Sequence, residues 1–354
     1  MRSVLAGVPL PSRSRLRSKA RYLLAGACGL GLLAAAGCGS TGGAGSTVST
    51  TVTIAAVPGV DDASVYLAQK DGLFAAEGLE HVQIKDYKNQ GQVMSALTNS
   101  QADIAASDYG NVFWQEGQAA HPKPLLRILA DGYDATSGVL EILTLPRSKT
   151  ITSPLSLANP NVTVGLPNDD ILQVPASVPT SLEAAAATNV LSDYLGSAAD
   201  AVNWKSMSQP DEITALKQGK VQAILLSEPY IYQAESQLGA VEVLDACSGS
   251  TAGLPLLGYV AMNAWVRDNP SVVADFQAAL AKAQTEAAVT GKVQGILPST
   301  AGIGAQEADM ITIGSYPTST SIGSLNAVVR LMVGPPQMIP YDPNVGPMIV
   351  KPSS

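Results

Sequence analysis

The feature that most restricts the fold is a strand-then-helix pattern near the start of the body of the chain. Residues 52–58 form a β-branched, apolar run that ends in Pro-Gly, and residues 64–77 follow with the apolar spacing of one helix face. Residues 82–87 and 103–107 are two further strand patterns, separated by a helical pattern at 92–98. Strands that alternate with helices of this length predict a parallel sheet covered by helices.

The same pattern returns later in the chain. Residues 162–167 resemble the first strand, and an Ala-Leu pair followed by an apolar strand occurs at both 96–108 and 215–228. This repetition predicts two related α/β lobes. The alternative is chance, because short apolar strands are common.

The remaining pattern has no counterpart in the second copy. It comprises a strand at 256–262, a helix from Pro270 to about Val289 and a last helix at 324–333, with loops around Gly291 and at 298–304. These elements must pack somewhere, so we expect the chain to return to the first lobe. The prediction is lobe 1 at 51–147 and 251–354 and lobe 2 at 148–250, with crossings near 140–146 and 248–258.

The first residues read as a targeting segment. A basic stretch precedes the apolar residues 22–36, which as a helix would span about 22 Å, less than the roughly 30 Å of a bilayer core. Residues 1–37 are therefore predicted to be a signal peptide, the alternative being a membrane-anchor helix. Residues 33–38, LAAAGC, resemble a bacterial lipobox, which implies lipidation of Cys38.

A flexible tether is predicted at 38–50 from its Gly, Ser and Thr content. No later segment is long and apolar enough to span a bilayer, so the only membrane contact that we expect is a lipid anchor on the outer, extracytoplasmic face of the cell membrane.

Composition excludes several functional classes. The chain is 46% hydrophobic and 14% charged, which argues against disorder. Its net charge is −8, although residues 1–37 contain only basic charges, so the rest is more acidic still. An acidic body argues against nucleic acid as a partner. Cys247 is the one cysteine left beyond Cys38, and His81 and His121 have no metal-ligand spacing, so we expect no metal and no cofactor.

Polar residues follow four apolar strands. The carboxyl ends of parallel strands are where α/β proteins bind ligands, and two facing lobes would bring four such ends to one cleft. Glu228 stands out because it follows a fully apolar strand and a buried carboxylate needs a partner. That partner is a ligand or, as the alternative, a backbone donor or a neighbouring Tyr that satisfies it structurally. Asp61 and Asp62 have an alternative role, which is to cap the helix near Ser64. The candidate ligand-binding residues are Pro58, Asp61, Asp62, Ser107, Asp108, Tyr109, Thr180, Ser181, Glu228 and Tyr230.

An enzyme is not the expected class. The chain has no GxSxG, no P-loop and no GxGxxG after a strand. The alternative that remains is an enzyme of the same fold acting on a small heterocycle or amine.

Residues 66–79, YLAQKDGLFAAEGL, carry a family resemblance. They resemble the AxxxGLFxxEGL helix of periplasmic proteins that bind aliphatic sulfonates, taurine, nitrate and thiamine-precursor pyrimidines. The Ser227-Glu228-Pro229-Tyr230 element and the helix at Pro270 are similar too, so the resemblance covers roughly residues 50–340. It implies an α/β periplasmic-binding-protein-like fold of type II, with two lobes that close on a small solute. It also implies a monomeric receptor for an ABC permease and its ATPase.

One departure from the family concerns the ligand. The short Gly-Ser turn that many members have after the first strand of lobe 2 is replaced by residues 168–175, and the following helix starts near Thr180 and Ser181. The proposed strand ends hold six acids and no Lys or Arg, namely Asp61, Asp62, Asp108, Asp169, Asp170 and Glu228. This predicts a neutral or cationic organic ligand, such as an aminopyrimidine-like ring or an amine, held by Glu228 with Tyr109 or Tyr230 stacking on it. The alternative is that several of these acids cap helices and the pocket is neutral.

Overall fold

The computed structural model describes residues 51–118, 120, 122–146, 148–167, 181–334 and 337–352. The predicted signal peptide, tether and lipidation site at Cys38 lie outside the described residues, as do Thr180, Asp169 and Asp170. The architecture below belongs to the compact unit Val48–Ser354. Within the part of the chain that is described, no helix has the length and apolar character that a bilayer crossing needs.

The first of two sheets is mixed. Its strands, in spatial order, are β2 (Val82–Asp86), β1 (Val52–Ala56), β3 (Ile104–Asp108), β10 (Pro255–Met262) and β4 (Leu126–Asp134). β1 pairs in parallel with β2 and β3, whereas β10 runs antiparallel to β3 and β4. We call this sheet and the helices on it lobe 1.

The second sheet has the same plan. Its order is β7 (Asn203–Met207), β6 (Thr163–Pro167), β8 (Ala223–Ser227), β5 (Leu140–Thr144) and β9 (Val241–Asp245). β6 pairs in parallel with β7 and β8, and β5 is antiparallel to β8 and β9. With its helices it forms lobe 2. The two matching strand orders are what a duplicated unit would give.

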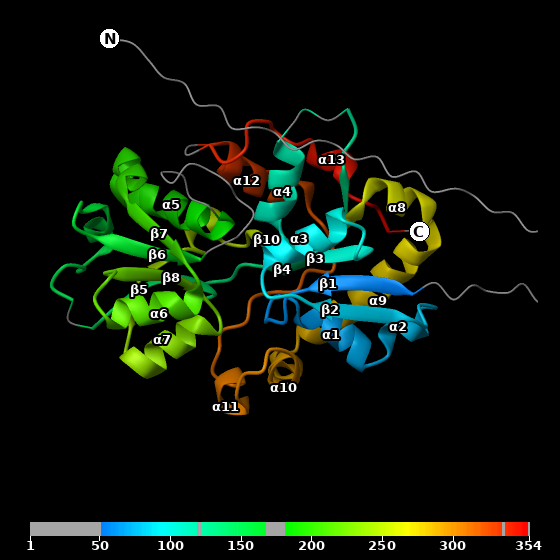
Figure 1. The fold of residues 1–354 in the computed structure, drawn as a ribbon, viewed down its shortest axis with the longest axis horizontal. Coiled ribbons are helices and arrows are strands. Elements are labelled where there is room, and N and C mark those ends of the chain that lie inside the picture. Colours follow the sequence, from blue (N-terminus) through cyan, green and yellow to red (C-terminus); the bar gives the residue numbers. More distant parts are fainter. Residues whose placement is uncertain are drawn as a thin grey trace, which may run out of the picture. The chain divides into compact units, whose positions relative to one another are not determined.

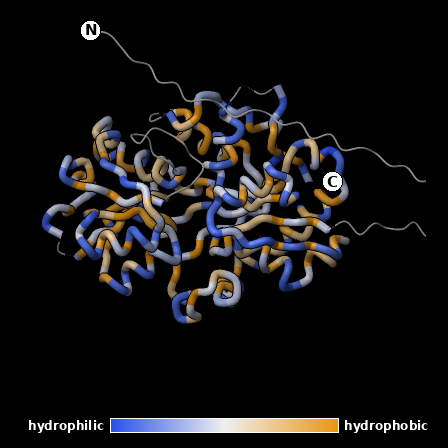
Figure 2. Tube along the Cα trace, viewed as in Figure 1, coloured by the Kyte–Doolittle hydropathy of each residue, from blue (hydrophilic) through white to orange (hydrophobic). Residues whose placement is uncertain are grey.

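Helices cover both faces of each sheet (Figure 1). In lobe 1, α3 (Gln90–Thr98) and α4 (Tyr109–Gly117) pack on one face, and α1 (Ala63–Lys70) and α9 (Pro270–Ala287) pack on the other. In lobe 2, α5 (Leu182–Leu195) lies opposite α6 (Gln209–Lys217) and α7 (Tyr230–Leu238). Figure 2 shows hydrophobic and hydrophilic segments alternating along the chain, and buried apolar residues of the strands pack with those of the covering helices.

The C-terminal third returns to lobe 1. α9 contacts α1, the short helix α2 (Leu73–Ala76) and β4, which all belong to lobe 1. The other helices of this part are α8 (Asn263–Asp268), α10 (Thr290–Thr300), α11 (Ala305–Ala308), α12 (Ile322–Val333) and α13 (Val345–Met348). α12 also contacts α5, so apolar packing joins the two lobes.

Three local expectations differ from the structure. The single helix expected at 64–77 is two helices, because Gly72 has φ of 69° and interrupts the helical turn. The loop expected around Gly291 is the start of α10, and the loop expected at 298–304 begins only after Thr300, because Pro298 lies in the last turn of that helix. Leu140–Thr144, placed in the lobe 1 segment, is a strand of the second sheet, where its buried apolar side chains lie between β8 and β9.

Candidate functional site

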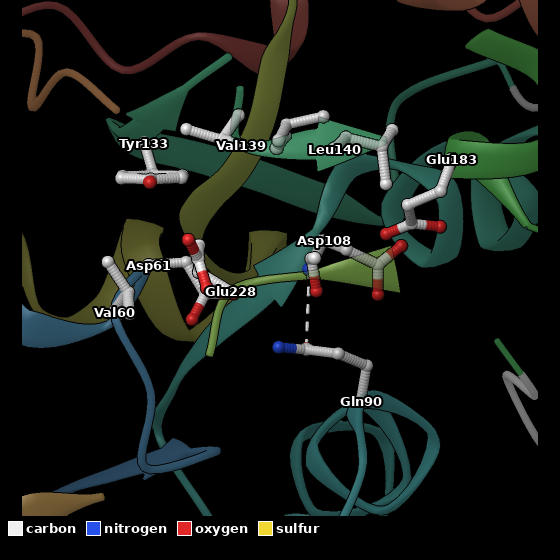
Figure 3. A pocket seen from close by; sticks show the side chains of 11 residues that line it. Val60, Asp61, Gln90, Asp108, Tyr133, Val139, Leu140, Glu183 and Glu228 are labelled. Atoms are coloured by element: carbon white, nitrogen blue, oxygen red, sulfur yellow. Dashed lines mark hydrogen bonds between the residues drawn. The ribbon is translucent and has the colours of Figure 1, made fainter. Parts of the chain in front are cut away.

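A pocket lies where the two lobes meet (Figure 3). It contains about 590 Å³ of space, part of it open to solvent. The segments that line it include the ends of β3 and β8 and the loops that follow β1 and β8, as expected for ligand sites in parallel sheets. Its lining residues are Val60, Asp61, Gln90, Asp108, Tyr133, Val139, Leu140, Glu183, Ser227, Glu228 and Leu256.

Four carboxylates line this pocket, two from each lobe. Asp61 lies in the loop between β1 and α1, and Asp108 ends β3. Glu183 is in the first turn of α5, and Glu228 directly follows β8. None of the described lining residues is Lys, Arg or His.

Asp108 is held firmly in place. Its Oδ1 accepts a hydrogen bond from the Asn111 amide at 2.7 Å, which caps α4, and its Oδ2 accepts one from Asn111 Nδ2 at 2.5 Å. Its own amide donates to Gln90 Oε1 at 3.3 Å. Burial, and then the negative charge of Glu183, raise the pKa of Asp108 to about 7.

Glu183 faces Asp108. Their carboxyl groups point toward one another in Figure 3. Burial raises the pKa of Glu183, and its Oε2 is buried without a hydrogen-bond partner of normal geometry. Burial, with a smaller contribution from the Glu183 charge, raises the pKa of Asp61 to about 6. These three carboxylates therefore destabilise one another's charge, and the described lining residues supply no counter-ion.

Glu228 is satisfied by backbone donors. Its Oε1 accepts from the Thr312 amide at 3.0 Å and its Oε2 from the Tyr232 amide at 3.2 Å. Burial raises the pKa of Glu228 despite these bonds. Because Thr312 belongs to the C-terminal segment after α11, this carboxylate connects lobe 2 to the part of the chain that returns to lobe 1.

Of the predicted ligand-binding residues, Asp61, Asp108 and Glu228 line the pocket. Asp62 is fully buried beside it. Its Oδ2 accepts from the Val57 amide at 3.1 Å, and although it stands at the N-cap of α1 its side chain makes no capping bond. Ser181 is buried and caps α5, its Oγ accepting from the Ala184 amide at 3.2 Å.

The two predicted stacking tyrosines are not pocket residues. Tyr109 is fully buried in the core of lobe 1, where its hydroxyl donates to Asp131 Oδ1 at 3.0 Å and its ring stacks on Phe113. Tyr230 is half-buried at the start of α7 and does not line the pocket. Pro58 and Ser107 do not line it either.

Other lining residues carry weak signals in the sequence. Glu183 is recognisable there only as an acid in the first turn of a helix, which more often serves the helix dipole than a ligand. Tyr133 comes from β4, and its hydroxyl accepts from the Gly314 amide at 2.6 Å. Gln90 escapes prediction because a Gln at a helix start has no chemical signature by itself.

The described residues of the pocket form no metal site. Among the described residues, no group of three or more His, Cys, Asp or Glu side chains is arranged to hold a metal ion. Asp169 and Asp170 lie outside the described residues, and the segment 168–180 that holds them contains no Lys, Arg or His in its sequence.

Comparison with known proteins shows a matching family and solved structures with a similar two-lobed fold. Residues 60–290 match the model of a protein family described as NMT1/THI5 like. The structure is similar to the periplasmic aliphatic sulphonate binding protein of Escherichia coli, with a TM-score of 0.64, 16% identity and coverage of 86% of this chain and 92% of that one. It is also similar to the alkanesulfonate-binding protein of Xanthomonas axonopodis pv. citri bound to MOPS, with a TM-score of 0.64, 13% identity and coverage of 85% of this chain and 98% of that one. The structure of a desulfurization enzyme is similar as well, with a TM-score of 0.59, 14% identity and coverage of 84% of this chain and 96% of that one. No match was found among curated protein sequences.

Proposed function

Because the chain belongs to the NMT1/THI5-like family, we propose that it is the solute-binding component of an ABC-type importer. The observation that carries this proposal is the pocket between the lobes, to which each lobe contributes two carboxylates. Such a pocket changes its volume and its electrostatics when the lobes move about their connections. A hinge motion of this kind couples capture of a solute to a shape that a permease can recognise.

The proposed setting is the outer face of the cell membrane. The lipobox at residues 33–38 and the Gly- and Ser-rich tether support a lipoprotein anchored through Cys38. Its partners would be a permease and its ATPase, and it would act as a monomer.

The first test concerns binding. Purified protein is screened by calorimetry against sulfonates, nitrate, amines and pyrimidines. We expect one class to bind with one solute per chain, and the solute to be recovered unchanged. Failure of every class to bind would contradict a receptor role.

The second test concerns the anchor. Cys38→Ala removes the thiol that would be lipidated, so we expect the variant to move from the membrane fraction to the soluble fraction. Cys247→Ser is the matched control, because Cys247 is buried in the folded body. A Cys38→Ala protein that remains fully membrane-bound would contradict lipid anchoring.

An enzyme of this fold is the second candidate. It is favoured by the similarity to a desulfurization enzyme and by the pKa of Asp108, which burial raises to about 7 and which suits proton transfer near neutral pH. Conversion of a bound solute by the purified protein would favour this candidate over the receptor.

A further inference from the structure

We propose that the pocket takes an organic cation with N–H donors, held between Asp108 of lobe 1 and Glu183 of lobe 2. This inference rests on the proposed function and specifies the chemical class of the solute. Three properties of the pocket lead to it, namely its uncompensated charge, its unused acceptors and its apolar walls.

The charge of the pocket calls for a counter-ion. Asp61, Asp108, Glu183 and Glu228 all line it, and no described lining residue is basic. The sequence of residues 168–180, which lie outside the described residues, contains no Lys, Arg or His. Buried carboxylates are tolerated only when they are paired or protonated. A positively charged solute would supply the missing pair, whereas an anionic solute would add to the repulsion.

The acceptors identify which kind of cation fits. Glu183 Oε2 is buried without a hydrogen-bond partner of normal geometry, and it faces the carboxyl group of Asp108 (Figure 3). A primary ammonium, an amidinium or a guanidinium can donate to both carboxylates at once. A quaternary ammonium has no N–H donor and is usually held by several aromatic faces. Tyr133 is the one aromatic residue among the described lining residues, so a cage of aromatic rings is absent from this set.

The remaining walls suit a carbon skeleton. Val60, Val139, Leu140 and Leu256 line the same pocket and present apolar surface. Burying a CH₂ group against such surface contributes about 0.8 kcal/mol, and an inorganic ion gains nothing from it. The described carboxylates are moreover not arranged as a metal site. Together these features favour an organic ammonium or amidinium over a metal ion.

Three probes with the same hydrocarbon tail test this inference: n-butylammonium, butyltrimethylammonium and butanesulfonate. Each is titrated into the full-length protein in detergent by calorimetry at constant ionic strength. We expect saturable binding of n-butylammonium, binding of butyltrimethylammonium weaker by about tenfold or more, and no binding of butanesulfonate, because a charge-assisted hydrogen bond contributes about 1.5–3 kcal/mol.

Variants identify the residues responsible. Glu183→Gln should weaken n-butylammonium binding by about 10- to 100-fold. Asp108→Asn should weaken it similarly while keeping the helix cap, because Asn also caps helices. Glu242→Gln is the matched control, since it removes the same charge from an exposed side chain of β9 outside the pocket, and it should leave binding unchanged.

The proposal is overturned if n-butylammonium does not bind saturably, if butyltrimethylammonium binds as tightly, or if Glu183→Gln and Glu242→Gln behave alike. Binding of butanesulfonate, or of an anion or neutral solute from the wider screen, would overturn the proposal that the solute is a cation. It would leave the receptor role intact. Failure of every solute to bind would count against both.

Discussion

Glu212 shows what an unpaired acid does when it lies in the core instead of a pocket. It is fully buried on α6 beside Gly165, and neither of its carboxyl oxygens makes a hydrogen bond of normal geometry. Burial raises the pKa of Glu212 to about 10, so the side chain is neutral in the folded protein at pH 7. In the unfolded chain it ionises above the ordinary glutamate pKa of 4.5, and this ionisation favours unfolding.

We therefore expect Glu212→Met, which has a similar size and no charge, to stabilise the protein. The gain should be small at pH 4, where both states bind the proton. It should grow as the pH rises above 4.5 and reach up to about 3 kcal/mol at pH 7. Urea unfolding across this pH range measures the gain, with Glu242→Gln as an exposed control. A difference that does not change with pH would contradict the assignment of Glu212 as a buried, protonated acid.

At the residue scale, the sequence selects residues that line the pocket where a polar group follows a strand directly, and their role in ligand binding stays a prediction. Asp61, Asp108 and Glu228 are found in this way, and all three line the pocket. The same reasoning is wrong for Tyr109, because a helix begins at that residue and turns its ring into the core. Glu183 escapes it because its position depends on how α5 packs between the lobes, which no local pattern encodes.

At the scale of elements, the duplication extends to single hydrogen bonds. Gln90 and Gln209 are the first residues of α3 and α6, and each accepts from the backbone amide at the end of the following strand, Asp108 at 3.3 Å and Ser227 at 2.9 Å. In both copies the sequence separation is 18 residues. The Ala-Leu pairs that indicate the repeat lie in these two helices.

A second pair of bonds repeats as well. Asp103 Oδ2 accepts from the Thr53 amide at 2.8 Å, and Gln222 Oε1 accepts from the Thr163 amide at 2.9 Å. The first bond holds the start of β1 against the start of β3, and the second holds the start of β6 against the start of β8. Periodicity can predict these strands because they are apolar and central. Periodicity cannot predict that β5 belongs to the second sheet, because an apolar run has the same pattern in either sheet.

β10 and α4 approach too closely for any side chain at Gly258. A Cβ there would lie 2.3 Å from the hydroxyl oxygen of Tyr109, whose hydrogen bond to Asp131 would have to shift. We expect Gly258→Ala to destabilise the protein by about 2–4 kcal/mol, through overpacking and the weakened buried bond. Thermal and urea unfolding would measure the loss.

Gly295→Ala is the matched control. Gly295 lies within α10, and nothing lies within 4 Å of the Cβ that would be added. Alanine is favoured over glycine in a helix, so this variant should gain about 0.5–1 kcal/mol. Equal effects of the two substitutions would contradict the close packing assigned to Gly258.

At the scale of the whole molecule, the two lobes are joined by contacts that differ in kind. α5 and α12 pack through apolar side chains. Glu228 accepts from the Thr312 amide, and Gln233 Nε2 donates to Glu307 Oε1 at 2.7 Å. Opposing them, like charges from both lobes face the same pocket. Two unit charges 4 Å apart interact by about 4 kcal/mol at an effective dielectric constant of 20, so the charge state of the pocket contributes to how readily the lobes come together.

Proton uptake should therefore compete with a cationic solute. The charges that act on Asp108 are those of Glu183 and Asp61, and the other titratable groups that line the pocket with it are Glu228 and Tyr133. Burial and Glu183 raise the pKa of Asp108 to about 7, and burial raises the pKa of Asp61 to about 6, so both are largely protonated at pH 5 and largely ionised at pH 8. A cation stabilises the ionised forms, so binding below these pKa values must release protons.

The affinity for n-butylammonium should accordingly rise with pH, by about tenfold or more between pH 5.5 and 7.5. Calorimetry at a series of pH values measures the slope, and comparison of phosphate with HEPES buffer at pH 7 detects the released protons through their buffer ionisation heats. Asp108→Asn removes one of the titrating groups, so its affinity should depend less steeply on pH, whereas Glu242→Gln should keep the wild-type slope. If the affinity were constant across this range, or rose as the pH fell, Asp108 and Glu183 could not be the groups that hold the solute.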